Sequence, residues 1–300
     1  MKTIRDAHFQ KDWIDMTPQI PEPCIDWIAE KYLDVSYGPA SLQKMDIYLP
    51  AQHGESCPLV VLVHGGGFCA CDKRDWHLYP GFYALQAGFA LASVNYQLSP
   101  EVRFPTPLDD LKTALRFLRE HAVQYSISTR DVFLYGTSAG GNLVTLAAFQ
   151  NAGTAQGVCG VAALCPLLDF EAQWHYLRTM TPAIPEREIL CNAMIDYLGA
   201  SPEQDRQTAL RASTAMYITE AAPPFYIQHG TLDPAVPVAQ AYQFAQQLRE
   251  KCGEGNVHLD ILEGVAHAGG GPEFLEEEHI APILAFFRAL CHKSEEEAAT

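Results

Sequence analysis

The stretch VFLYGTSAGG, residues 132–141, decides the fold and holds the strongest functional pattern of this sequence. Its first four residues are apolar or aromatic and predict a buried strand, and residues 140–149 predict the helix that follows. Glycines two residues before and two residues after Ser138 remove side chains that would clash in a sharp turn between these elements. We therefore expect Ser138 to be a nucleophile at a strand–turn–helix junction. A glycine-rich turn that only packs is the alternative.

Short strand patterns alternate with helical patterns on both sides of this stretch. Residues 33–38 and 42–49 predict an antiparallel hairpin at the start of the sheet. Further strands are expected at residues 59–63, 90–96, 161–164, 225–228 and 257–262. This order predicts the α/β class, with a mostly parallel, roughly eight-stranded sheet, an antiparallel N-terminal hairpin and helices on both faces.

The chain has 300 residues, of which 48% are hydrophobic and 19% charged, as is usual for a folded globular protein. We predict a single domain over residues 1–300, because no repeat or low-complexity linker divides it. Prolines interrupt residues 1–30, an irregular N-terminal extension. The strand alternation lapses over residues 169–212, which predicts a short helical lid or cap insertion over the C-terminal edge of the sheet.

The charge and cysteine content limit the partners and the location. Lys and Arg number 20 against 36 Asp and Glu, a net charge of −16, so nucleic acid and anionic membrane surfaces are poor partners. No secretory signal and no apolar run of membrane-spanning length are found. Nine irregularly spaced cysteines without a CxxC predict reduced thiols and a cytoplasmic location. No metal and no cofactor is expected, and the sequence is compatible with a homodimer.

A serine hydroxyl needs a general base and a group that orients this base. Asp233 follows the strand at 225–228 and a turn, and His267 follows the strand at 257–262. The order Ser, Asp, His, with each residue at the end of a strand, predicts a catalytic triad at one edge of the sheet. Alternatively, Asp233 caps a helix and His267 is a surface loop residue. His229, at the start of the Asp233 turn, is expected to be packed rather than catalytic.

The segment HGGGF, residues 64–68, follows the strand at 59–63. Acyl transfer passes through an oxyanion, which backbone N–H groups stabilise when no side chain blocks the approach. We expect the N–H groups of Gly66, Gly67 and Ala139 to form the oxyanion hole, with His64 bonding the loop backbone. A phosphate-cradling loop is the weaker alternative, because no Lys-Ser/Thr pair follows.

Four bulky aromatic residues near the predicted elbow and in the insertion indicate a short acyl pocket: Phe68, Trp76, Trp174 and Tyr176. Ordinary core aromatic residues are the alternative. Asp109 and Asp110 are expected to complement the positive end of the helix that Pro107 opens. His77 and His279 lack partners at metal-ligand spacing.

Taken in order, these motifs resemble those of the hormone-sensitive-lipase-like carboxylesterases. The similarity runs from HGGGF through VNYQLSPE (94–101), FPTPLDD (104–110), GTSAGG (136–141) and HGTLDPAVP (229–237), and covers about residues 34–290. The family pattern Tyr-Arg-Leu-Ala-Pro-Glu differs here at Gln97 and Ser99. Residues 41–50 resemble bifunctional feruloyl and acetyl-xylan esterases and bacterial acetyl esterases. The resemblance implies an α/β-hydrolase fold and esterase activity.

Three functions fit the sequence. The first is a serine carboxylesterase that hydrolyses short-chain esters, among them acetyl or feruloyl esters of carbohydrates, through an acyl-enzyme. The second is a serine peptidase of the same fold, which the triad alone does not separate from an esterase. The third is a non-catalytic ligand-binding protein of this fold. A small-molecule ester is the expected partner.

Overall fold

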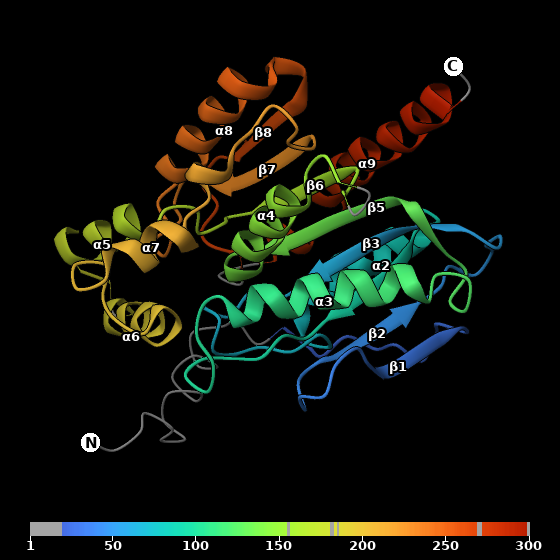
Figure 1. The fold of residues 1–300 in the computed structure, drawn as a ribbon, viewed down its shortest axis with the longest axis horizontal. Helices are drawn as coiled ribbons and strands as arrows, with labels where there is room; N and C mark the ends of the chain where they lie inside the picture. The colour runs from blue at the N-terminus through green and yellow to red at the C-terminus, as the bar shows by residue number, and fades with distance from the viewer. Residues whose placement is uncertain (1–19, 155–156, 181–182, 185, 269–271, 299–300) are drawn as a thin grey trace.

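The computed structural model describes residues 20–154, 157–180, 183–184, 186–268 and 272–298. One eight-stranded sheet runs through the molecule in the order β1-β2-β4-β3-β5-β6-β7-β8 (Figure 1). β2 is antiparallel to both of its neighbours, and the other neighbouring strands are parallel. The strands are β1 Lys31–Ser36, β2 Lys44–Tyr48, β3 Cys57–Val63, β4 Ala90–Val94, β5 Ile127–Thr137, β6 Gly160–Leu164, β7 Phe225–Gly230 and β8 Val257–Leu262.

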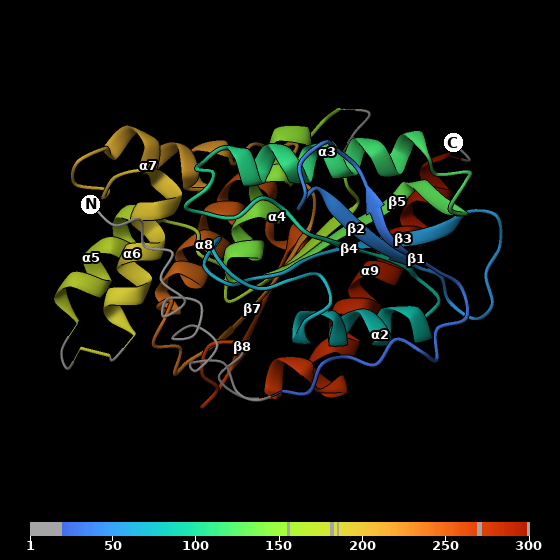
Figure 2. The same cartoon turned by 90° about the horizontal axis from the view of Figure 1, so that it is seen from below.

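Helices cover both faces of the sheet. In Figure 2, α3, α4 and α8 lie on one side of the strands, and α2 and α9 lie on the other. The α-helices are α2 Tyr79–Gln86, α3 Thr106–Glu120, α4 Ala139–Asn151, α5 Phe170–Thr179, α6 Arg187–Leu198, α7 Arg206–Ala212, α8 Ala239–Cys252 and α9 Glu277–Ala298. The predicted parallel sheet, its N-terminal antiparallel hairpin and its two helical layers are therefore confirmed.

The hydrophobic core lies on both sides of the sheet, which explains the uninterrupted apolar strands. Every residue of β4 and β6 is buried, because both of their faces meet helices. On one side, Leu108, Leu111 and Leu115 of α3 belong to a large buried cluster. On the other side, Ile283 and Phe287 of α9 belong to a second cluster. Leucines at helical spacing therefore form the buried stripe that the sequence predicts.

The segment 169–212 is largely helical where the structure describes it. It contains α5, α6 and α7, which gather at one end of the molecule, the left end in Figure 1. The parallel strands point toward this end, so the three helices stand beside the loops that follow the strands. At the other predicted extension, residues 20–30 form no helix or strand, and residues 1–19 lie outside the described residues.

One expectation about α3 needs correction. Asp109 lies in the first turn of the helix, as expected, but Asp110 lies beyond the first turn and is buried. Its carboxylate accepts hydrogen bonds from the backbone N–H of Gln97 at 2.8 Å and from the side chain of Gln43 at 2.7 Å. Burial among these donors, rather than the helix dipole, explains an acid at this position.

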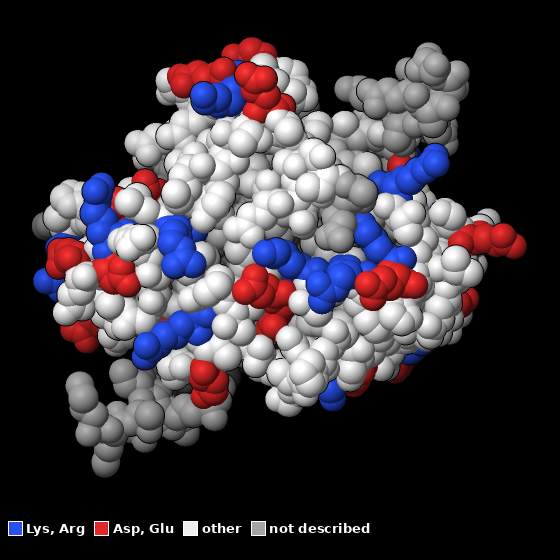
Figure 3. Space-filling view, viewed as in Figure 1, with Lys and Arg blue, Asp and Glu red and all other residues white. Residues whose placement is uncertain are grey.

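The surface and the thiols agree with the composition. On the face drawn in Figure 3, Lys and Arg side chains lie among Asp and Glu side chains, separated by wide uncharged areas. No disulfide joins any of the nine cysteines, all of which lie in the described ranges. No helix in the described ranges combines the length and the hydropathy needed to cross a bilayer.

Candidate active site

Ser138 stands between β5 and α4, at the junction that the sequence predicts. Its backbone has φ 54° and ψ −115°, a strained conformation for a residue with a side chain. Two bonds hold this turn: the Ser138 N–H donates to the Leu164 carbonyl at 2.8 Å, and the Asn142 N–H donates to the Ser138 carbonyl at 3.1 Å. A Cβ on Gly140 would lie 2.2 Å from the Val63 carbonyl oxygen, so only glycine fits where α4 starts.

Asp233, His267 and Ser138 form one hydrogen-bonded chain. Nδ1 of His267 lies 2.6 Å from Oδ2 of Asp233, and Nε2 of His267 lies 3.0 Å from Oγ of Ser138. The loops after β7 and β8 meet through backbone bonds, among them Leu232 N–H to Val265 carbonyl at 2.9 Å. Two residues 34 positions apart in sequence are thereby brought into contact.

Asp233 is buried and accepts hydrogen bonds on both oxygens. Oδ1 accepts the N–H groups of Ala235 and Val236, both at 2.8 Å. Oδ2 faces His267 and also Nε2 of His229, which lies 3.0 Å away. Burial alone would raise the pKa of Asp233, but the nearby His267 and the hydrogen bonds from the two imidazoles hold it well below its usual range. Asp233 is therefore an anion at neutral pH.

His229 has a larger part in the site than packing alone. It is fully buried, and its Nε2 also lies 2.9 Å from the Val236 carbonyl. The His229 ring thus supports the turn that carries Asp233. It also lies against Oδ2 of Asp233, the same oxygen that faces His267. The position of His229 near the end of β7 could have pointed to this site in the sequence. Its contact with Asp233, however, depends on how the turn after β7 folds back onto the strand.

Cys165 is a residue of this site that the sequence analysis did not single out. It directly follows β6, is fully buried, and its sulfur lies within 4.8 Å of the ligand atoms of Asp233 and His267. Burial would lower the pKa of His267, but Asp233 and Cys165 more than offset this effect, so the pKa lies well above its usual value. The signal that could have found Cys165 is its place after a strand, like Ser138 and Asp233.

The HGGGF loop lies against the elbow. Gly66 and Gly67 have φ values of 87° and 58°, in the left-handed region. Within the described part of the chain, their N–H groups have no hydrogen-bond acceptor. A Cβ on Gly66 would lie 2.3 Å from the Ala70 carbonyl oxygen. His64 bonds its own loop, with Nδ1 3.0 Å from the Gly65 carbonyl, as the sequence predicts.

A cavity of about 280 Å³ opens beside these groups. Its wall includes Ser138, His267, Gly66, Gly67 and Ala139. Apolar side chains of α5 and α6 complete it, namely Leu177, Leu190, Ala193 and Met194, together with Ile184 between these helices. Ser138, His267 and the two glycines therefore line one mostly apolar chamber.

The four aromatic residues expected at the pocket divide into two pairs. Phe68 and Trp76 line the cavity, whereas Trp174 and Tyr176 are absent from its described wall. Trp174 is buried in the core, and the hydroxyl of Tyr176 donates to the Pro234 carbonyl at 3.2 Å. Gln173 and Leu177 of α5 face the chamber instead, so the face of the helix, rather than residue size, decides which side chains line it.

Groups with metal-ligand chemistry occur at three places in the described residues: Cys165, Asp233 and His267; Cys71, Asp75 and His77; and Glu276, Glu278 and His279. The second group combines ligand types that zinc accepts. Both oxygens of Asp75, however, already accept N–H groups, with Oδ1 2.7 Å from Nδ1 of His77 and Oδ2 3.0 Å from the Asp72 N–H. Each oxygen of Asp75 therefore already accepts at least one hydrogen bond in this structure.

A family model with the description BD-FAE matches residues 45–248. The chain belongs to the BD-FAE family. This match confirms the resemblance that the motifs indicate.

Other known proteins agree with this assignment. Esterase LipQ of Mycobacterium tuberculosis is 28% identical over 256 residues, or 84% of this chain and 60% of LipQ. Hormone-sensitive lipase of Ictidomys tridecemlineatus is 32% identical over 52% of this chain and 21% of that protein. The chain thus spans less than two thirds of these curated relatives. A solved carbohydrate esterase from gut microbiota, in truncated form, shares the fold with a TM-score of 0.77 at 19% identity, covering 90% of this chain and 99% of that one. The fold is that of the α/β-hydrolases.

Proposed function

We propose that this protein is a serine carboxylesterase that cleaves short-chain carboxylic esters through an acyl-enzyme. The observation that carries the proposal is the hydrogen-bonded chain from Asp233 through His267 to Ser138 at the wall of a cavity. A nucleophile, a base and an orienting carboxylate in this geometry are the parts that acyl transfer requires. The membership in a family with esterase relatives supports the same activity.

The reaction follows from the positions of these groups. Oγ of Ser138 attacks the ester carbonyl carbon while Nε2 of His267 accepts the hydroxyl proton. The N–H groups of Gly66, Gly67 and Ala139 stabilise the oxyanion. The intermediate collapses, the C–O bond to the alcohol breaks, and His267 returns the proton to the departing alkoxide. Water then attacks the acyl-enzyme by the same route and releases the acid and free Ser138.

The chamber favours small acyl groups. Its volume of about 280 Å³ lies just below the usual range of about 300–1,000 Å³ for ligand pockets. Phe68 and Trp76 narrow it on one side, and α5 and α6 close it on the other. We propose that residues 169–212 act as a lid over it. Acetyl esters of carbohydrates fit this space with less rearrangement than feruloyl esters, which carry a bulky aromatic acyl group.

The test is hydrolysis of p-nitrophenyl acetate by the wild type, by Ser138→Ala and by a matched variant, Ser36→Ala, whose serine is exposed on β1. We expect loss of turnover in Ser138→Ala alone. A series of acetate to octanoate esters, with acetylated and feruloylated xylan fragments, then defines the acyl pocket. Equal rates for Ser138→Ala and wild type would refute the proposal, and cleavage of aminoacyl-nitroanilides without ester turnover would favour a peptidase.

A further inference from the structure

A second carboxylate–imidazole pair stands at the cavity, on the loop that follows HGGGF. Oδ1 of Asp75 accepts the backbone N–H of His77 at 2.9 Å and lies 2.7 Å from Nδ1 of the same residue. Trp76 stacks on the imidazole at a ring distance of 3.7 Å. His77 is buried, with 4% of its surface exposed, and it lines the cavity together with Trp76. The orientation of this ring is therefore fixed before any ligand arrives.

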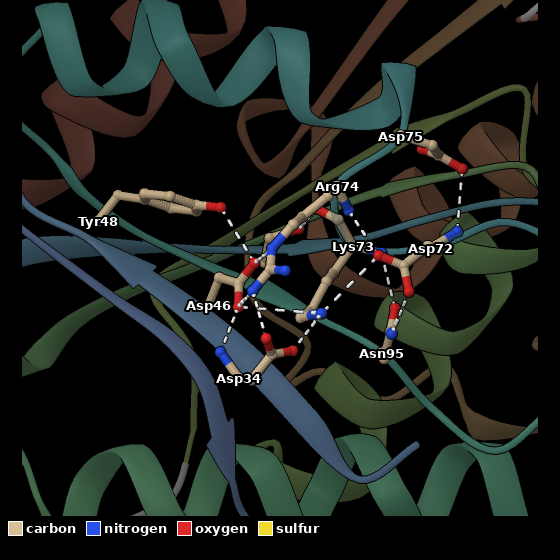
Figure 4. A network of polar contacts seen from close by, with 9 residues as sticks. Asp34, Asp46, Tyr48, Asp72, Lys73, Arg74, Asp75 and Asn95 are labelled. Atoms are coloured by element: carbon tan, nitrogen blue, oxygen red, sulfur yellow. Dashed lines mark hydrogen bonds and ion pairs between the residues drawn. The ribbon is translucent and has the colours of Figure 1, made fainter. Parts of the chain in front are cut away.

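A network of charged groups fixes the loop itself (Figure 4). Arg74 pairs with Asp46 through Nε and with Asp34 at 2.8 Å, both from the hairpin of β1 and β2. The buried Lys73 lies 3.0 Å from Asp34. Asn95, just after β4, donates to Asp72 at 2.6 Å. Contacts with β1, with β2 and with the residue after β4 thus hold residues 72–75, and with them His77, in place.

The other ring nitrogen of His77 lies near Gly65, on the side of Ser138. Nε2 lies 2.9 Å from the position that a Cβ on Gly65 would occupy, and Cβ of Ser138 lies 3.4 Å from the same point. No hydrogen bond of this nitrogen occurs within the described residues. Because Nδ1 donates a hydrogen bond to the Asp75 carboxylate, Nε2 is the nitrogen that carries the lone pair in the neutral form of the ring, and in that form it can accept.

Gln173, another polar side chain of the cavity wall, already has hydrogen-bond partners within the protein. Gln173 donates to the Ala235 carbonyl at 2.6 Å and accepts from Gln240 at 2.8 Å. Nε2 of His77 thus offers an acceptor on a wall that is mostly apolar apart from Gln173 and from Glu186 at the start of α6. A buried acceptor of this kind discriminates strongly between a ligand that donates to it and one that does not.

We propose that His77 is a specificity-determining residue whose Nε2 accepts a hydrogen bond from a hydroxyl group that the ester carries beside its scissile carbonyl. The inference rests on the proposed esterase activity and assigns its substrates to hydroxylated esters. Asp75 acts as the positioning residue that keeps the proton on Nδ1. The hydroxyl can belong to the acyl part or to the alcohol part, and the substrates below separate these two sources.

The experiment compares kcat/KM within two pairs of esters. Methyl glycolate against methyl propanoate places the hydroxyl in the acyl part, and 2-hydroxyethyl acetate against propyl acetate places it in the alcohol part. We expect the hydroxylated member of one pair to be preferred, and His77→Leu to reduce that preference about tenfold. His77→Gln keeps a polar group and should restore part of it. His258→Leu, the same change at an exposed residue of β8, should leave the ratio unchanged.

A wild-type measurement covers the case in which His77→Leu does not fold. Methylation of the hydroxyl, as in methyl methoxyacetate or 2-methoxyethyl acetate, removes the donor and should abolish the preference. A preference that survives methylation, or one that His77→Leu leaves within twofold, overturns the inference while the esterase activity stands. The absence of preference in both pairs does the same. Failure of the wild type to hydrolyse any of these esters overturns the proposed function as well.

Discussion

Replacing Asp233 with asparagine tests the hydrogen-bonded chain most directly, because the surrounding donors determine how the amide must sit. Oδ1 accepts two backbone N–H groups at 2.8 Å, from Ala235 and Val236. An amide nitrogen cannot accept, so the amide oxygen must remain at this position. The new NH₂ group then replaces Oδ2, 2.6 Å from Nδ1 of His267.

This arrangement favours the other neutral tautomer of His267. Nδ1 of His267 must now accept from the amide, so the ring proton moves to Nε2, which faces Oγ of Ser138 at 3.0 Å. A protonated Nε2 cannot take the serine proton. We expect kcat to fall about 10⁴-fold, which corresponds to about 5.5 kcal/mol in the activation barrier.

The assay is the initial rate of p-nitrophenyl acetate hydrolysis, with thermal unfolding to show that the variant is folded. Asp169→Asn is the matched control, because Asp169 caps α5 by accepting the Ala172 N–H at 2.9 Å, and asparagine caps helices about as well. Its rate should stay within about twofold of the wild type. A folded Asp233→Asn protein with more than a tenth of wild-type kcat would refute the assigned proton path.

Three further outcomes are expected. The raised pKa of His267 should place the acidic fall of kcat/KM at a midpoint above pH 6.5, because only the neutral imidazole accepts the serine proton. A midpoint below about pH 6 in a pH–rate series would contradict this prediction. Gly66→Ala puts a methyl group 2.3 Å from the Ala70 carbonyl oxygen at a positive φ, so the loop must shift; kcat should fall about 10²- to 10³-fold in steady-state kinetics, and the unfolding temperature should fall as well. Asp46→Asn leaves Arg74 with Asp34 alone and should lower the free energy of unfolding by about 2–3 kcal/mol in urea titrations; a loss below about 0.5 kcal/mol would contradict it.

The sequence by itself determined the sheet, the elbow and the order of the triad. These features depend on local chemistry: apolar runs of strand length, glycines around Ser138 that permit a strained turn, and polar residues placed just after strands. Because parallel strands end at the same edge, strand-end positions alone predict that Asp233 and His267 approach Ser138. The structure brings these three side chains together through the loops after β5, β7 and β8.

Only the tertiary structure decided which other side chains join them. His229 and Cys165 reach the triad, and His77 reaches the cavity, through contacts between segments far apart in the chain. Trp174 and Tyr176 stay off the cavity wall, because the rotation of α5 about its axis turns Gln173 and Leu177 toward it instead. Helix rotation and loop approach are set by packing against distant elements, and a linear pattern of residue types does not contain that information.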